Sequence, residues 1–178
     1  MLGAVRNQTL PYRVALLLCV LEAGGAVAGP QPVTNAPPGL SNVFRLTPRV
    51  LSGSFPVGDA AFAWLAAQGI KTIVSVDGPR PDVKAARRHG LSYVHLPVGY
   101  DRVPTNRVAE LVKLAATLPG PFYVHCHHGQ HRSPVAAAIM CEAAAHWTAD
   151  QAEAFLQQAG AGSDFPELNR SVREIHMP

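Results

Sequence analysis

The residues best suited to chemistry lie in one short stretch, Val124-His125-Cys126-His127-His128-Gly129-Gln130-His131-Arg132-Ser133-Pro134. Cys126 supplies a nucleophilic thiol, and Arg132 supplies a guanidinium that matches a pair of phosphate oxygens. Gly129 allows the backbone between them to turn sharply, so that several amide N–H groups face one centre. Oriented amides of this kind favour the thiolate form of a cysteine. The stretch therefore predicts a nucleophile and an oxyanion site in the same loop.

The segments on either side of the loop predict how it is held. Phe122–His125 is a short apolar run typical of a buried strand. Val135–Ala145 is almost wholly apolar, which indicates a helix buried at the centre of the fold, and Pro134 fits its first turn. Because the loop then leads into a helix N-terminus, the helix dipole favours an anion bound there.

The pattern His125-Cys126-x5-Arg132-Ser133, with Gly129 inside it, resembles the signature loop of the cysteine-dependent protein tyrosine phosphatases. The short chain resembles their compact dual-specificity branch. The resemblance implies that Cys126 attacks phosphorus as a thiolate and forms a cysteinyl-phosphate, while Arg132 holds the phosphoryl oxygens. It also implies that Ser133 helps the sulfur to leave, that His125 tunes the cysteine through the loop backbone, and that no metal or other cofactor takes part. The expected phosphate-binding groups are the backbone N–H groups of His127, His128, Gly129, Gln130, His131 and Arg132.

The reaction also needs a general acid to protonate the leaving oxygen. In the family this residue is an aspartate on a loop that precedes the signature strand. Asp101 fits best, because it follows a predicted strand that ends at Leu96. Asp77, at the exit of the preceding strand, is the second candidate, and its alternative role is that of a turn residue in Asp-Gly-Pro.

Other functions fit the loop less well. Rhodanese-type sulfurtransferases use a shorter loop, which would misplace Arg132. The histidines at 127, 128 and 131 suggest a metal site, but side chains that alternate outward do not converge on one ion, so no metal is predicted. Those histidines are better suited to a rim for a polyanionic substrate. A pseudophosphatase that binds phosphate or a phosphoprotein without turnover remains the alternative function.

The rest of the chain alternates strand-like and helix-like segments, which predicts an α/β domain with a largely parallel central sheet flanked by helices. Asp59 is expected to cap the first helix. The predicted strands are 42–46, 49–52, 71–76, 91–96 and 122–125. The predicted helices are 59–68, 82–89, 105–117, 135–145, 148–160 and 166–175.

The N-terminal region predicts export. Two arginines precede the eight-residue apolar run Val14–Leu21, and Ala26 and Ala28 supply the small residues of a cleavage site. This layout predicts a signal peptide over 1–28, and a periplasmic or secreted protein. The run is far shorter than the ~20 residues that span a bilayer, so stable membrane insertion is not expected. Residues 29–40, rich in proline and glycine, are expected to form a linker before a single phosphatase-like domain over 41–178.

Composition excludes several other classes. The chain has 178 residues, of which 48% are apolar and 15% charged, which is unlike a disordered tail or a multispan membrane protein. The net charge of +3 is not clustered, so a nucleic-acid partner is not expected. Three cysteines are too few for a disulfide scaffold. The expected partner is a phosphorylated protein or small molecule.

Overall fold

The computed structural model describes residues 29–174, so the predicted signal peptide over 1–28 lies outside the described residues. The sheet has six strands in the order β1-β2-β3-β6-β4-β5. Strands β3, β6, β4 and β5 run parallel to one another, and β1 and β2 are antiparallel additions at the β3 edge. The strands are β1 (Gln31–Pro32), β2 (Phe44–Thr47), β3 (Val50–Ser54), β4 (Thr72–Ser75), β5 (Ser92–His95) and β6 (Phe122–Cys126).

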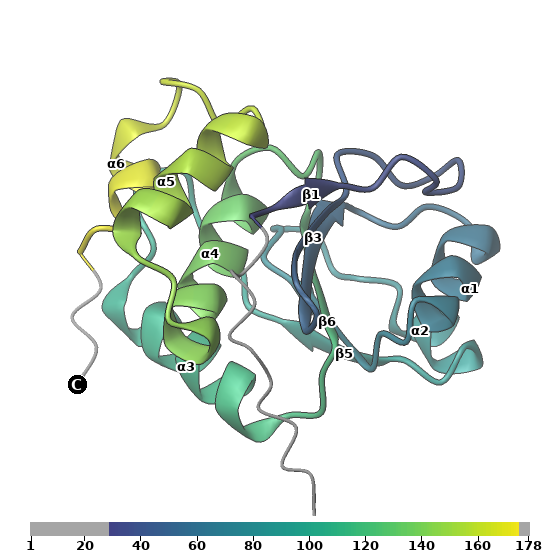
Figure 1. Ribbon diagram of the computed structural model, residues 1–178. Helices are drawn as coiled ribbons and strands as arrows, with labels where there is room; N and C mark the ends of the chain where they lie inside the picture. Colours follow the sequence, from purple (N-terminus) through teal and green to yellow (C-terminus); the bar gives the residue numbers. More distant parts are fainter. Residues whose placement is uncertain (1–28, 175–178) are drawn as a thin grey trace, which may run out of the picture.

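Helices cover both faces of this sheet, as Figure 1 shows. They are α1 (Asp59–Ala67), α2 (Val83–Arg88), α3 (Thr105–Thr117), α4 (Arg132–Ala145), α5 (Ala149–Gln158) and α6 (Pro166–Arg170). Helices α1 and α2 lie on one side, and α3, α4, α5 and α6 lie on the other. The predicted class, a layered α/β domain with a largely parallel central sheet, is confirmed.

Each face of the sheet has its own hydrophobic core. Phe62 and Leu65 of α1 pack against Ile73 and Tyr123 on one face. On the other face α4 is the central element, and every residue from Arg132 to Cys141 is buried. Burying a helix on all sides requires a nearly continuous apolar sequence, which is what predicted its central place.

The register of the parallel strands brings their carboxyl ends together beside the loop that follows β6. Ser54 of β3 pairs with Cys126, and Ser75 of β4 pairs with His125. Asp77 follows β4 by two residues, so the topology places it next to the start of the catalytic loop. Ligands of α/β sheets bind at the carboxyl ends of the strands, and this is the edge at which the predicted chemistry lies.

Two helix ends differ from expectation. Gly58, not Asp59, is the N-cap of α1, because the Asp59 carboxylate instead pairs with Arg88 and His89 near the end of α2. The last helix, expected over 166–175, ends at Arg170 and continues as turns. Such short C-terminal segments give little periodicity from which to place an end.

The residues expected to form a linker, 29–40, instead lie on the domain. Gln31 and Pro32 pair with β2 as an edge strand, and the Val33 amide donates to the Val43 carbonyl at 2.8 Å. Leu40 is buried in the core beside α1. Proline is tolerated at the edge of a sheet, so a proline-rich segment can pair there. The ordered fold therefore begins before the expected start at Ser41.

No helix within residues 29–174 is both long enough and apolar enough to cross a bilayer.

Candidate active site

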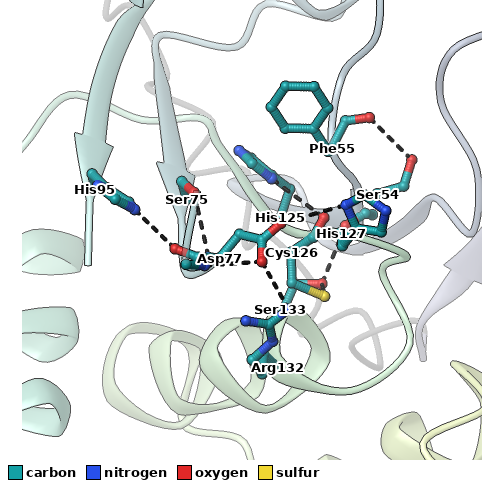
Figure 2. Close-up of polar contacts among 12 residues, drawn as sticks. Ser54, Phe55, Ser75, Asp77, His95, His125, Cys126, His127, Arg132 and Ser133 are labelled. Carbon is teal, nitrogen blue, oxygen red and sulfur yellow. Dashed lines mark hydrogen bonds and ion pairs between the residues drawn. The ribbon is translucent and has the colours of Figure 1, made fainter. Parts of the chain in front are cut away.

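The predicted catalytic loop lies between the end of β6 and the start of α4 (Figure 2). Cys126 is the last residue of β6 and is 3% exposed, and Arg132 is the first residue of α4. Between them, Gly129 has φ +77°, a conformation that residues with a Cβ rarely adopt. A Cβ at this position would lie 2.6 Å from the carbonyl carbon of Gly53 in β3. The sharp turn expected from the sequence is present, and glycine is required for it.

Backbone carbonyls of the loop bond outward, which leaves its amides available. The carbonyl of His127 accepts a hydrogen bond from the Phe55 amide at 3.2 Å. The carbonyl of Gly129 accepts one from the Asn42 side-chain amide at 2.8 Å. Within the described part of the chain, no acceptor takes a hydrogen bond from the amides of residues 127–131. An array of unpaired amides ahead of a helix N-terminus is suited to binding an anion.

Ser133 lies against the sulfur, as the resemblance implies. Its hydroxyl is 3.3 Å from Sγ of Cys126 and donates to that sulfur. The same hydroxyl lies 3.1 Å from the Gly53 carbonyl oxygen. A thiolate has no proton to donate, so this hydroxyl is placed to stabilise the negative charge on the sulfur.

Arg132 contacts two side chains, and one of its donors has no partner. Its side chain pairs with the buried carboxylate of Asp77, with Nη2 2.8 Å from Oδ1, as Figure 2 shows. Its Cζ lies 4.3 Å from the centre of the Tyr100 ring, in cation–π contact. Nε is buried and has no hydrogen-bond partner among the described residues. A buried unpaired donor is costly, and a phosphate oxygen beside the loop amides would satisfy it.

Comparison with known proteins agrees with this geometry. A family model described as "DSP-PTPase phosphatase fused to NAD+ Kinase" matches residues 46–164, about two thirds of the chain. The chain belongs to this DSP-PTPase family. A comparison with curated protein sequences finds no match.

Solved structures show the same fold. TpbA of P. aeruginosa is 26% identical, with a TM-score of 0.65 over 84% of this chain and 91% of that one. The catalytic core of the PP-IP phosphatase SIW14 of S. cerevisiae is 14% identical, with a TM-score of 0.63 over 85% of this chain and 89% of that one. Human DUSP28 is 21% identical, with a TM-score of 0.57 over 81% and 95%. The chain is a cysteine-based phosphatase of the dual-specificity type, as its loop predicts.

His125 is a buried residue that contacts the backbone of the phosphatase loop. It is fully buried, and its Nε2 lies 2.5 Å from the Tyr93 hydroxyl. Its Nδ1 lies 3.4 Å from the Cys126 carbonyl oxygen, the backbone link that the resemblance implies. Burial lowers the pKa of His125 to about 4. The ring is therefore neutral at neutral pH and can donate from Nδ1 while it accepts from Tyr93.

The two candidates for the general acid lie in different surroundings. Asp77 is buried, and its carboxylate forms the ion pair with Arg132. The same carboxylate accepts a hydrogen bond from the Gly78 amide in the turn, at 2.9 Å. Asp101 is exposed on the loop between β5 and α3, and its Oδ1 would lie 2.6 Å from a Cβ at Gly99. An acid that meets a substrate must be reachable and must not be occupied with a cation. Asp101 stays the predicted acid, and Asp77 is engaged with Arg132.

The remaining polar side chains of the loop form its rim. His127 and His128 are exposed, and Nδ1 of His127 lies 3.8 Å from Oδ2 of Asp77. Gln130 is also exposed, and His131 packs against Phe165 with ring centres 4.9 Å apart. In residues 29–174, no three histidine, cysteine, aspartate or glutamate side chains come together in a way that could hold a metal ion.

The role of Asn42 could not be inferred from the sequence. It adopts φ +51°, and its side-chain amide donates to the carbonyls of both Gly129 and Ala159 at 2.8 Å. It thereby ties the phosphate loop to the end of α5. Asparagine tolerates this backbone conformation better than most residues, but only the fold reveals what its side chain contacts.

Proposed function

We propose that the protein hydrolyses phosphate monoesters in two steps, with Cys126 as the nucleophile. In the first step the thiolate attacks phosphorus and forms an S–P bond, while the P–O bond to the leaving group breaks. The leaving oxygen keeps the bonding electron pair and takes a proton from Asp101. The loop amides and Arg132 bind the three equatorial oxygens, where negative charge is spread in the transition state.

In the second step water attacks the phosphorus of the cysteinyl-phosphate. The carboxylate of Asp101 takes a proton from the water, the S–P bond breaks, and inorganic phosphate leaves. The sulfur departs as a thiolate, and the hydroxyl of Ser133, 3.3 Å away, stabilises its charge. Both steps balance without an oxidant, a metal or another cofactor.

The observation that carries this proposal is the set of unpaired donors around Cys126. The amides of residues 127–131 have no acceptor within the described chain, and Nε of Arg132 is buried without a partner. These donors lie in one segment, from the loop after Cys126 to Arg132, the first residue of α4. A phosphoryl group seated there would fill them while its phosphorus faces the nucleophile.

Phosphotyrosine is the first substrate to test. TpbA, which shares 26% of its residues with this chain, has also been crystallised as a cysteine-to-serine variant in complex with pTyr. The exposed histidines at the rim, His127 and His128, suit a polyanionic substrate as a second choice.

Phosphate release from an aryl phosphate under reducing conditions tests the proposal. Wild type is expected to turn over, Cys126→Ser to be inactive, and Asp101→Asn to be slower by about 100- to 10 000-fold, the usual contribution of general acid catalysis. Phosphate binding without any turnover in the wild type would instead indicate a binding module. Turnover unaffected by Asp101→Asn would remove that residue from the mechanism.

We also propose that the protein is exported, on the basis of the sequence pattern in residues 1–28. Expression of the full chain with its own N-terminus, followed by N-terminal sequencing of the mature protein, tests this. A mature chain that begins at Gly29 outside the cytoplasm is expected. An intact N-terminus in the cytoplasm would refute it.

A further inference from the structure

The loop that carries Asp101 is attached to the domain through its neighbours. Asp101 is exposed, and no hydrogen bond or ion pair within residues 29–174 holds its carboxylate. On its far side, Arg102 pairs with Glu174, and the Val103 amide donates to the Ser171 hydroxyl at 3.0 Å. On its near side Val98 is buried in the core, and its amide donates to the Val76 carbonyl at 3.2 Å. Between Val98 and Asp101 the chain has only Gly99 and Tyr100, so Tyr100 is the side chain best placed to hold the acid itself.

Tyr100 is held by aromatic and cationic contacts although it is 41% exposed. Its ring centre lies 4.3 Å from Cζ of Arg132 and 4.4 Å from the ring centre of Phe165, with 35° between the two rings. Phe165 in turn packs edge-on against His131 at 4.9 Å. The ring therefore joins the acid loop to the first turn of α4 and to the segment before α6.

The contact of Tyr100 with Arg132 leaves the arginine free to bind phosphate. The guanidinium carbon lies over the face of the Tyr100 ring, and a cation–π contact of this kind uses none of the N–H donors that bond to phosphate. Of those donors, Nη2 already bonds to Asp77, and Nε is free. Tyr100 can therefore remain in contact with Arg132 while a phosphoryl group occupies the loop.

We propose that Tyr100 is a positioning residue for the general acid. Its ring fixes the Asp101 loop to the same guanidinium that binds the phosphoryl group, so that the acid and the leaving oxygen are held in one frame. This inference rests on the proposed role of Asp101. It assigns to Tyr100 an effect on proton transfer and none on the binding of phosphate, which Asp77 and the loop amides maintain.

The test uses the dependence of kcat/KM on the leaving group. Dinitrophenolate leaves without a proton, whereas phenolate needs one, so dinitrophenyl phosphate reports on the nucleophile and phenyl phosphate reports also on the acid. Tyr100→Ala is expected to lower kcat/KM about 10-fold for phenyl phosphate, part of the roughly 100- to 10 000-fold that an acid contributes. It is expected to leave kcat/KM for dinitrophenyl phosphate and inhibition by inorganic phosphate unchanged.

Two variants serve as controls. Tyr100→Phe keeps the ring, so it is expected to behave as wild type with both substrates. Leu118→Ala removes another exposed apolar side chain, 37% exposed at the C-cap of α3, and is expected to change neither rate. Thermal unfolding of Tyr100→Ala checks that the loop remains folded through its contacts at Arg102 and Val103.

The outcomes separate this inference from the proposed function. An equal loss for both substrates, or a parallel loss of phosphate inhibition, would show that Tyr100 acts on Arg132 and would overturn the inference. No loss with either substrate would overturn it as well. Asp101→Asn, measured beside it, decides the other question: if that variant lacks the leaving-group dependence, the acid assignment fails and the inference fails with it.

Discussion

The pair between Asp77 and Arg132 gives the sharpest single perturbation, Asp77→Asn. The two side chains are 5% and 10% exposed, and Oδ1 lies 2.8 Å from Nη2. Asparagine keeps the shape and one oxygen, but it removes the charge that orients the guanidinium. If Asp77 positions Arg132, this variant weakens every interaction that the guanidinium makes with the phosphoryl group.

The size of the effect follows from the burial of the pair. A hydrogen bond to a charged group contributes about 1.5–3 kcal/mol, and solvent screens this pair little. Each 1.4 kcal/mol or so of lost transition-state stabilisation slows the reaction about tenfold. We therefore expect kcat/KM to fall about 10- to 150-fold in Asp77→Asn, together with weaker inhibition by inorganic phosphate.

The assay compares dinitrophenyl phosphate with phenyl phosphate. An equal loss for the two substrates is expected, because Arg132 acts on the phosphoryl group whatever leaves. A loss confined to phenyl phosphate, with phosphate inhibition intact, would refute the reasoning and make Asp77 the general acid. Asp150→Asn is the matched control, because it removes the carboxylate of an exposed pair with Arg173 and should change nothing.

Three further predictions concern stability and the loop. Burial lowers the pKa of His125 from 6.5 to about 4, so the unfolded state binds more protons between these values. The free energy of unfolding should therefore fall by up to about 3 kcal/mol as pH drops from 6.5 to 4, and denaturant titrations of His125→Asn should lack this dependence. Burial raises the pKa of Glu142 from 4.5 to about 7, so its charged form destabilises the folded state increasingly as pH rises through this range. Glu142→Gln should therefore raise the free energy of unfolding by about 1 kcal/mol at pH 8, allowing for screening, and leave it unchanged at pH 4. An equal gain at both pH values would count against this cause. Gly129→Ala should lose inhibition by phosphate, because its Cβ would clash with Gly53. The control Gly160→Ala also has a positive φ, +82°, but its nearest neighbour is 3.9 Å away, so it should cost only about 1–2 kcal/mol of backbone strain. Intact inhibition in Gly129→Ala would contradict the loop geometry.

The catalytic loop could be predicted from the sequence because its parts are contiguous. Cys126, Gly129, Arg132 and Ser133 lie within one strand–loop–helix unit, and the apolar segments around them indicate that unit directly. Once the strand and the helix are placed, local geometry dictates where the thiol, the amides and the guanidinium point. The alternating pattern of strands and helices likewise predicted the parallel sheet.

The side chains that contact Arg132 could not be predicted in the same way. Asp77 reaches it only because β4 lies next to β6 in the sheet, and Tyr100 only because the loop after β5 returns over α4. Neither contact leaves a local signal, so the sequence leaves Asp77 as the second candidate for the acid or as a turn residue. The pairing of residues 31–32 with β2 was missed for the same reason, since a two-residue strand is defined by its partner.

The measurement that tests the central claim most directly is the capture of the phosphoryl group on the enzyme. A rapid acid quench during turnover of an aryl phosphate, followed by mass spectrometry of the peptides, should find one phosphoryl group on Cys126. It should find none in Cys126→Ser, which should also be inactive. Turnover that continues in Cys126→Ser, or a phosphoryl group on another residue, would contradict the account.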